Sequence, residues 1–495
     1  MATTAFEHRA NRSVKAWWRL TACALALMLV PALASAIPLF NRQTGQNCVA
    51  CHAGGQFPEL TPYGRLFKMT GYTLGVHTSL PVSAMGLASV SKVANTSKSD
   101  DPAADFQKND QLIFATGSVF LGGKITDNIG AFTQFTWDPY ATTTDSGGFK
   151  GEFAADNMDI RYADRFISDS HDVIFGVSAN NDPSVTDPWN TAAAWMQYVP
   201  VPSPTSSQFI DGASPYPGLA AGSNVAGLNA YAFIDQTIYV EAGDYRTAKG
   251  LFSFMKAGLH DADVTKLQGN NPYVRVALNH AWGAHSLMVG LTHMTSRVYD
   301  DPLDTSDPST VDRYRDLSLD TQYQFLLDPH AWTAQLVYSR ETHDYPAALA
   351  GQPSPFVDAH GNALAASSNT DRTRLLRAKL SYVYQARYGG SAAFFNLAGT
   401  TNTANQTSGY DPATLTITSN ATAGAPSTRV NGSLTGNPAT RGATLESFWL
   451  PLQNLRIGLQ YTAYMKYNGA RDNYDGFGRN ARDNNSLFLY AWTAY

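Results

Sequence analysis

Several features are scarce in this 495-residue chain, and each absence excludes a class of protein. Charged residues make up only 15% of the sequence, with 40 acidic against 35 basic side chains, so nucleic acid is excluded as a partner. After the first 36 residues, no apolar run approaches the roughly 20 residues that a membrane-spanning helix needs. Cysteine occurs only three times, and Cys23 lies in a segment that we expect to be removed. A structural zinc site needs about four ligands, so the cysteine count argues against one in the mature chain.

Residues 1–36 have the organisation of a secretory signal peptide. Basic residues come first, an apolar run follows at residues 20–33, and Ala34-Ser35-Ala36 is typical of a cleavage site. We therefore expect the mature chain to begin near Ile37, in an oxidising compartment.

The two remaining cysteines belong to one motif, Cys48-Val49-Ala50-Cys51-His52. Two thiols at this spacing can bond covalently to the two vinyl groups of one haem, while the histidine that follows reaches the haem iron. A Cys48–Cys51 disulfide is chemically feasible but gives no reason for His52 to follow directly. The motif predicts one covalently bound c-type haem with His52 as an axial ligand.

From residue 81 to residue 495, apolar residues recur with a period of two, which predicts β-strands. Residues 455–467, for example, place Leu459 and Tyr461 on one face and Gln460 and Thr462 on the other. Long strands that are apolar on one face and polar on the other are typical of a transmembrane β-barrel, although a soluble β-sandwich is the alternative. The same alternation is seen in residues 316–325 and 376–384.

The connections between these strands favour the barrel. Short turns, as at residues 126–128 and 388–390, alternate with long polar stretches, as at residues 182–222. Counting strands between them gives about sixteen, so the first strand starts and the last strand ends on the side of the short turns. The chain also ends on an aromatic, Tyr495, which closes an alternating strand. We therefore predict an all-β, outer-membrane barrel of about sixteen antiparallel strands.

Residues 37–80 form a small segment between the signal and the barrel. About 45 residues are near the lower limit for a self-sufficient core, so we expect this cytochrome-like segment to depend on its haem and on the barrel wall, as a plug in the lumen. One α-helix is well marked in it, because Thr61 can cap it, Pro62 fits its first turn and Gly71 can end it. Arg42, Arg65 and Lys68 are candidate contacts for the haem propionates, and ion pairs with the lumen wall are the alternative.

Residues 40–45 (FNRQTG), the haem motif, residues 57–65 (FPELTPYGR) and residues 67–72 (FKMTGY) resemble the fused outer-membrane cytochrome-porins of iron-oxidising bacteria. The likeness in motifs covers residues 37–85, with Asn41 as a small departure, and beyond them it is a likeness of architecture. It implies an outer-membrane protein that oxidises extracellular Fe²⁺ and passes the electron to a soluble periplasmic cytochrome. Both termini would then be periplasmic, with the long loops at the cell surface.

The sixth ligand of the haem iron is open, because methionine and histidine are both common there. The candidates before or within the first strand are Met85, His77 and Met69, and an open site is a further alternative. Met85 follows Ser83-Ala84, which is similar to a small-small-methionine stretch of the family. We therefore expect Met85 first.

Two other functions stay open from the sequence. The haem barrel could exchange electrons with another surface partner, such as a mineral, a solid or a foreign cytochrome. Alternatively, it could be a porin channel whose haem segment is a structural plug. Beyond the haem motif, the sequence shows no catalytic arrangement.

Overall fold

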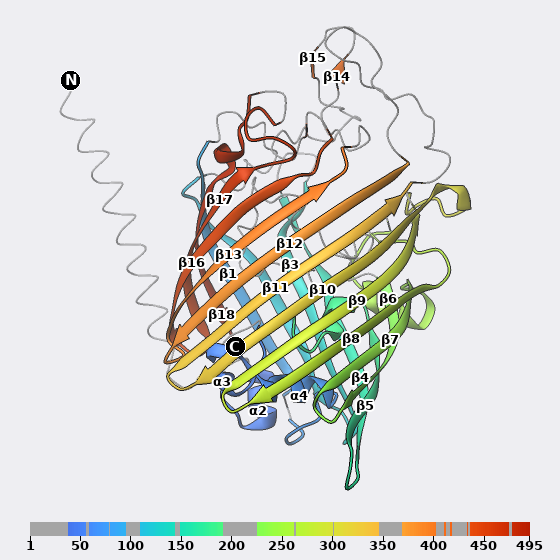
Figure 1. The fold of residues 1–495 in the computed structure, drawn as a ribbon, viewed down its shortest axis with the longest axis vertical. Helices are drawn as coiled ribbons and strands as arrows, with labels where there is room; N and C mark the ends of the chain where they lie inside the picture. Colours follow the sequence, from blue (N-terminus) through green and yellow to red (C-terminus); the bar gives the residue numbers. More distant parts are fainter. Residues whose placement is uncertain are drawn as a thin grey trace, which may run out of the picture.

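Sixteen antiparallel strands close into a barrel within the part of the chain that the computed structural model describes (Figure 1). The described residues are 38–55, 59–78, 80–95, 109–143, 149–191, 225–261, 264–299, 301–345, 369–401, 410–411, 416–417, 433, 436–474 and 478–495. Neighbouring strands pair in sequence order, and β1 pairs with β18 to complete the ring. The predicted fold class and strand number are confirmed. The barrel strands are β1 (Val82–Val93), β2 (Leu112–Lys124), β3 (Ile129–Thr143), β4 (Phe149–Ile167), β5 (Asp172–Asn180), β6 (Val225–Ile234), β7 (Ile238–Thr247), β8 (Asn271–Trp282), β9 (His285–Tyr299), β10 (Val311–Leu327), β11 (His330–Asp344), β12 (Thr370–Tyr384), β13 (Tyr388–Gly399), β16 (Thr440–Leu452), β17 (Leu455–Lys466) and β18 (Ser486–Ala494), and a separate pair is formed by β14 (Tyr410–Asp411) and β15 (Thr416–Ile417).

The alternation seen in the sequence becomes an apolar outer surface and a polar lumen. On β10, Leu317 and Leu319 are about half exposed, at 47% and 50%, whereas Ser318 and Asp320 are buried. Strand closure leaves no free edge, so the backbone groups of each strand find partners in its neighbours. A closed barrel that is apolar outside and polar inside is the architecture of a protein that spans an outer membrane with strands.

The short turns, the start of the first barrel strand and the end of the last barrel strand all lie at the same end of the molecule. Ala84 and Tyr495 exchange two backbone hydrogen bonds of 2.7 Å there, which ties the last residue to the first strand. The turn between β12 and β13 is at residues 385–387. The predicted position, residues 388–390, was therefore about three residues too far towards the C-terminus. The β4–β5 hairpin projects beyond the barrel at this end (Figure 1).

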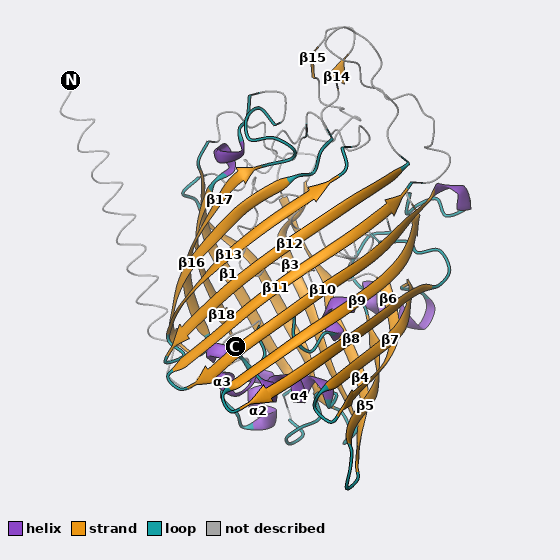
Figure 2. Ribbon diagram, viewed as in Figure 1, coloured by secondary structure: helices purple, strands orange, loops and turns teal. Residues whose placement is uncertain are grey.

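The described residues before β1 form short helices inside the short-turn end of the barrel (Figure 2). These helices, which we call the plug, are α2 (Pro38–Thr44), α3 (Cys48–Cys51), the 3₁₀ turn η1 (Ala53–Gly55) and α4 (Pro62–Met69). The predicted helix is confirmed in α4, where the Thr61 side chain accepts a hydrogen bond from the Gly64 amide at 3.1 Å. Gly71 follows with φ +70°, a conformation that favours glycine at a helix end. Among the described residues, no helix is both long and apolar enough to cross a bilayer.

The connection after β5 turns into the lumen. Residues 181–191, which include the helix α5 (Pro183–Thr186), are mostly buried, and we call them the inner loop. Its Trp189 is 1% exposed and packs with Met69 of the plug and Tyr239 of the wall. The prediction of a surface loop over residues 182–222 was therefore wrong for residues 182–191, because this tryptophan anchors them inside, while residues 192–222 lie outside the described ranges. Further 3₁₀ turns are η3 (Gly250–Lys256), η4 (Pro308–Thr310) and η6 (Ala481–Asn484).

Candidate haem-attachment site

Cys48 and Cys51 lie three residues apart on the single-turn helix α3, which places both thiols on the same side of the helix. They are not joined in a disulfide, and both side chains are partly exposed. His52 ends the helix, and its amide donates to the Cys48 carbonyl at 2.8 Å. The Cys48 thiol also lies 3.6 Å from the Gln453 carbonyl, in the turn between β16 and β17. The motif thus sits between the plug and one sector of the barrel wall.

The next part of the plug holds the backbone of the motif in place. The Thr61 amide donates to the Cys51 carbonyl at 2.9 Å, and the Ala53 amide donates to the Glu59 carbonyl at 2.8 Å. The start of α4 packs so closely on α3 that a Cβ on Gly64 would lie 2.2 Å from the Cys51 carbonyl oxygen. Only glycine fits this contact without a shift of the backbone. The geometry of the two thiols is therefore fixed by backbone contacts.

Burial controls the ionisation of the motif. It lowers the pKa of His52 to about 4, with a smaller opposing effect of the Glu59 carboxylate. Burial also raises the pKa of the Cys51 thiol to about 11. The imidazole is thus neutral at pH 7, and neutral imidazole is the form that can bind a metal.

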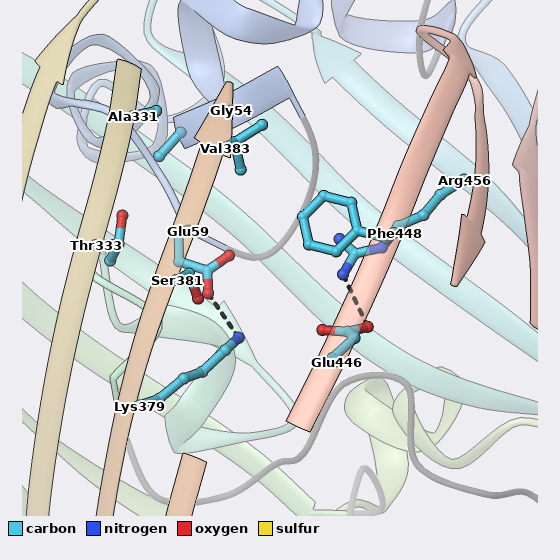
Figure 3. A pocket seen from close by; sticks show the side chains of 11 residues that line it. Gly54, Glu59, Ala331, Thr333, Lys379, Ser381, Val383, Glu446, Phe448 and Arg456 are labelled. Carbon is cyan, nitrogen blue, oxygen red and sulfur yellow. Dashed lines mark hydrogen bonds and ion pairs between the residues drawn. The ribbon is translucent and has the colours of Figure 1, made fainter. Parts of the chain in front are cut away.

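Beside the motif, a hollow opens between the plug and the wall (Figure 3). It holds about 430 Å³, including space open to solvent, and Ala53, Gly54 and Glu59 form its plug side. Its wall side is lined by residues of β11, β12, β16 and β17, namely Ala331, Thr333, Lys379, Ser381, Val383, Glu446, Phe448 and Arg456.

Each cation lining this hollow is paired with a carboxylate. Lys379 Nζ lies 2.7 Å from Glu59 Oε1, and Arg456 lies 2.9 Å from Glu446 Oε1, as the dashed lines in Figure 3 show. Burial alone would raise the pKa of Glu59, but the charge and hydrogen bond of Lys379 outweigh it and lower the pKa. The Arg456 guanidinium also stacks 3.6 Å from the centre of the Phe448 ring. The Glu59–Lys379 pair joins residues far apart in the sequence, so the sequence alone does not predict it.

The residues present fit a covalently bound haem. Two thiols on one side of a fixed helical turn, followed by a neutral histidine, are the donor set that c-type attachment requires. Within the described residues, no three His, Cys, Asp or Glu side chains converge as the ligands of a metal ion.

The three candidate propionate contacts are not brought together. Arg42 donates to the backbone carbonyls of Leu80 and Val82, at the start of β1. Arg65 is buried and donates to Gln324 on β10 at 2.8 Å. Lys68 is buried too, and its ammonium donates to the Asp187 carbonyl of the inner loop at 2.7 Å. Burial, together with the nearby Arg161 charge, lowers the pKa of Lys68 to about 8, and burial lowers that of Arg65 to about 10. Propionate binding by these residues stays a prediction, and each has other partners in this structure.

The candidate sixth ligands lie in three different environments. Met69 is 3% exposed in an apolar cluster with Trp189 and the wall strands β5 to β9. His77 is exposed in the segment between the plug and β1. Met85 lies on the lumen face of β1 and packs beside Leu87 and Trp492. Of these, Met85 lies on the side of the barrel that holds the motif, since β1, β18, β17 and β16 are consecutive strands.

Comparison with known proteins adds likenesses of fold. No family model and no curated protein matches the sequence. Among solved structures, the chain is similar to OmpT, an outer-membrane protein of Vibrio cholerae, at 9% identity and a TM-score of 0.40, over 85% of this chain and 99% of that one. OmpF of Salmonella typhi, in complex with daunomycin, matches at 8% identity and 0.42, over 84% and 97%. The outer-membrane channel DcaP of Acinetobacter baumannii matches at 10% and 0.39, over 84% and 96%.

Proposed function

We propose that this protein is an outer-membrane electron conduit that oxidises extracellular Fe²⁺ and passes the electron to a soluble periplasmic cytochrome. The observation that carries the proposal is the haem-attachment motif, held by backbone contacts inside the lumen of a membrane-spanning barrel. The sequence resemblance to fused cytochrome-porins supports the donor and the acceptor. Both termini and the short turns would face the periplasm, and the long connections would lie at the cell surface.

Each part of the chain has a role in this proposal. Cys48 and Cys51 would hold the haem through their sulfur atoms, and His52 would bind its iron. When bound, the haem supplies a centre that takes up and releases one electron at a time, which suits the change from Fe²⁺ to Fe³⁺. The hydrocarbon core is about 30 Å thick, so the barrel would serve to hold this centre within that barrier. The exposed apolar side chains of the outer surface would contact lipid.

The first test is electron transfer across a membrane. Proteoliposomes that contain the haem-loaded protein and a trapped soluble ferric cytochrome c should show reduction of the trapped protein when Fe²⁺ is added outside. A mineral, an electrode or a foreign cytochrome as the only effective donor would favour the second function instead. Rapid solute release with no electron transfer would contradict the proposal and favour a porin channel.

We expect Met85 to be the sixth iron ligand, and leucine substitutions test this. Met85→Leu should remove the weak near-infrared band of a methionine-bound ferric haem and lower the reduction potential, because a methionine ligand raises it. Met69→Leu is the matched control, since Met69 packs in an apolar cluster, and it should leave the band and the potential unchanged. If Met69→Leu removes the band and Met85→Leu does not, Met85 is not the ligand.

A further inference from the structure

Two carboxyl groups lie together on the lumen wall. They are farther from the short turns than the residues of the wall that contact the plug. Asp316 of β10 and Glu341 of β11 are direct partners in the strand register, and both belong to the lumen-facing set of their strands. Because side chains directly opposite each other on antiparallel strands have Cβ atoms about 5 Å apart, the two carboxyl groups lie side by side in the lumen. Asp316 is only 1% exposed, and neither of its carboxylate oxygens has a hydrogen-bond donor among the described residues.

Such a pair is unfavourable if both groups are ionised and nothing else is bound. Two carboxylates in contact repel each other, and burial adds the cost of removing a charge from water. The site must therefore hold a positive charge, either a proton shared by the pair or a cation.

The surroundings of the pair supply little compensation. Asp371 of β12 adds a third acidic side chain beside the pair, because it lies opposite His343, two residues along β11 from Glu341. Among the described residues, the hydroxyl that donates to Glu341 is that of Thr373, at 3.4 Å.

The neighbouring acidic side chains on the same wall have partners other than Asp316 and Glu341. Asp320 lies on the same face of β10, closer to the plug, and accepts two hydrogen bonds from Arg275, of 3.0 and 2.7 Å. In the other direction, Asp312 lies 3.3 Å from His343. Asp371 itself accepts hydrogen bonds from hydroxyl groups. Asp316 thus belongs to a column of acidic side chains on β10, with Asp312 and Asp320. A divalent ion compensates Asp316, Glu341 and the nearby Asp371 better than one proton does.

We propose that Asp316 and Glu341 bind a divalent metal ion in the lumen, through carboxylate oxygens and with water completing the coordination. That the physiological ion is Fe²⁺ rests on the proposed function. Oxygen ligands suit hard and borderline divalent ions, and two protein ligands make a weak site, which an ion in transit can leave. The pair would then be a transient binding site for the iron substrate between the cell surface and the plug.

Mn²⁺ tests this site without any redox step. Titration of Mn²⁺ into the full-length, haem-loaded protein in detergent, followed by electron paramagnetic resonance of the free ion, should show a binding site in the wild type. Asp316→Asn and Glu341→Gln should each weaken it by at least about tenfold, and the double variant should abolish it. Asp344→Asn is the matched control, because it removes one acidic charge from the same strand, where Asp344 pairs with Arg315. Mn²⁺ binding that is the same in the double variant as in the wild type would overturn the proposal and leave a shared proton.

Two further readings separate this proposal from the proposed function. All variants should show the heat-dependent gel mobility of a folded barrel, and dithionite should reduce their haem as in the wild type. If the site delivers iron, the double variant should be reduced more slowly by low concentrations of Fe²⁺. If Fe²⁺ fails to reduce even the wild type while Mn²⁺ binding depends on the pair, the metal site stands and the proposed function fails. If Fe²⁺ reduces wild type and double variant equally and Mn²⁺ binding is unchanged, the function stands and the site fails.

Discussion

Replacing both Cys48 and Cys51 with alanine is expected to abolish covalent haem attachment while the barrel still folds. The two thiols are the only groups of the motif that can form bonds to the haem vinyl groups, and the wall strands pair without their help. Haem-dependent peroxidase staining after denaturing electrophoresis should fall from strong to absent. Reduction by Fe²⁺ should be lost, whereas the circular dichroism of the β-sheet and the gel mobility of the folded barrel should persist.

Val49→Ala is the matched control for this double variant. Val49 lies between the two cysteines and is 45% exposed, so its truncation changes the motif without removing a bonding group. It should keep covalent haem at the wild-type level. Full haem staining in the double cysteine variant would show that this motif is not the attachment site.

Arg275→Met is expected to lower the free energy of unfolding by about 3–5 kcal/mol, as is typical when one partner of a buried ion pair is removed. Arg275 is 1% exposed and binds Asp320 of the wall, and it lies 3.2 Å from Asp187 of the inner loop. Methionine would leave both carboxylates buried without their main cation. Unfolding by guanidinium chloride in detergent, followed by tryptophan fluorescence, measures the change.

The chain contains a second arginine–aspartate pair that serves as the control. Arg165 and Asp172, on the projecting β4–β5 hairpin, form two bonds of 2.7 and 2.6 Å, which is as good a geometry as that of Arg275 with Asp320. The Arg165 side chain is 42% exposed, however, so Arg165→Met should cost at most about 1 kcal/mol. Equal effects of the two substitutions would show that burial of the Arg275 pair does not matter to stability.

The barrel was predictable because the alternation of apolar and polar residues can be recognised within a single strand. Alternating residues such as Leu317 and Ser318 face lipid and lumen in turn, so a period of two along each strand reports a property of the whole surface. The helix α4 was predictable for the same reason, since Thr61 and Pro62 act within one turn of chain. The inner loop was missed because Trp189 is held by contacts with Met69 and Tyr239, and nothing near it in the sequence distinguishes it from a surface tryptophan.

The candidate site was predictable only where its residues are adjacent in sequence. Cys48, Cys51 and His52 form one continuous motif, so their chemistry could be read directly. Glu59 and Lys379 pair across 320 positions, a contact that depends on how the plug enters the barrel. The Asp316–Glu341 contact depends in turn on the register of β10 against β11, and a shift of one residue would turn one of the two side chains to the lipid face.

Oxidation of Fe²⁺ by the bound haem is tested most directly by the visible spectrum of the purified ferric protein before and after anaerobic mixing with Fe²⁺, on a timescale of seconds and without a mediator. The absorption bands of reduced c-type haem should appear rapidly. Bands that appear with dithionite but not with Fe²⁺ would contradict iron oxidation, and the absence of any covalent haem would contradict the electron-transfer role itself.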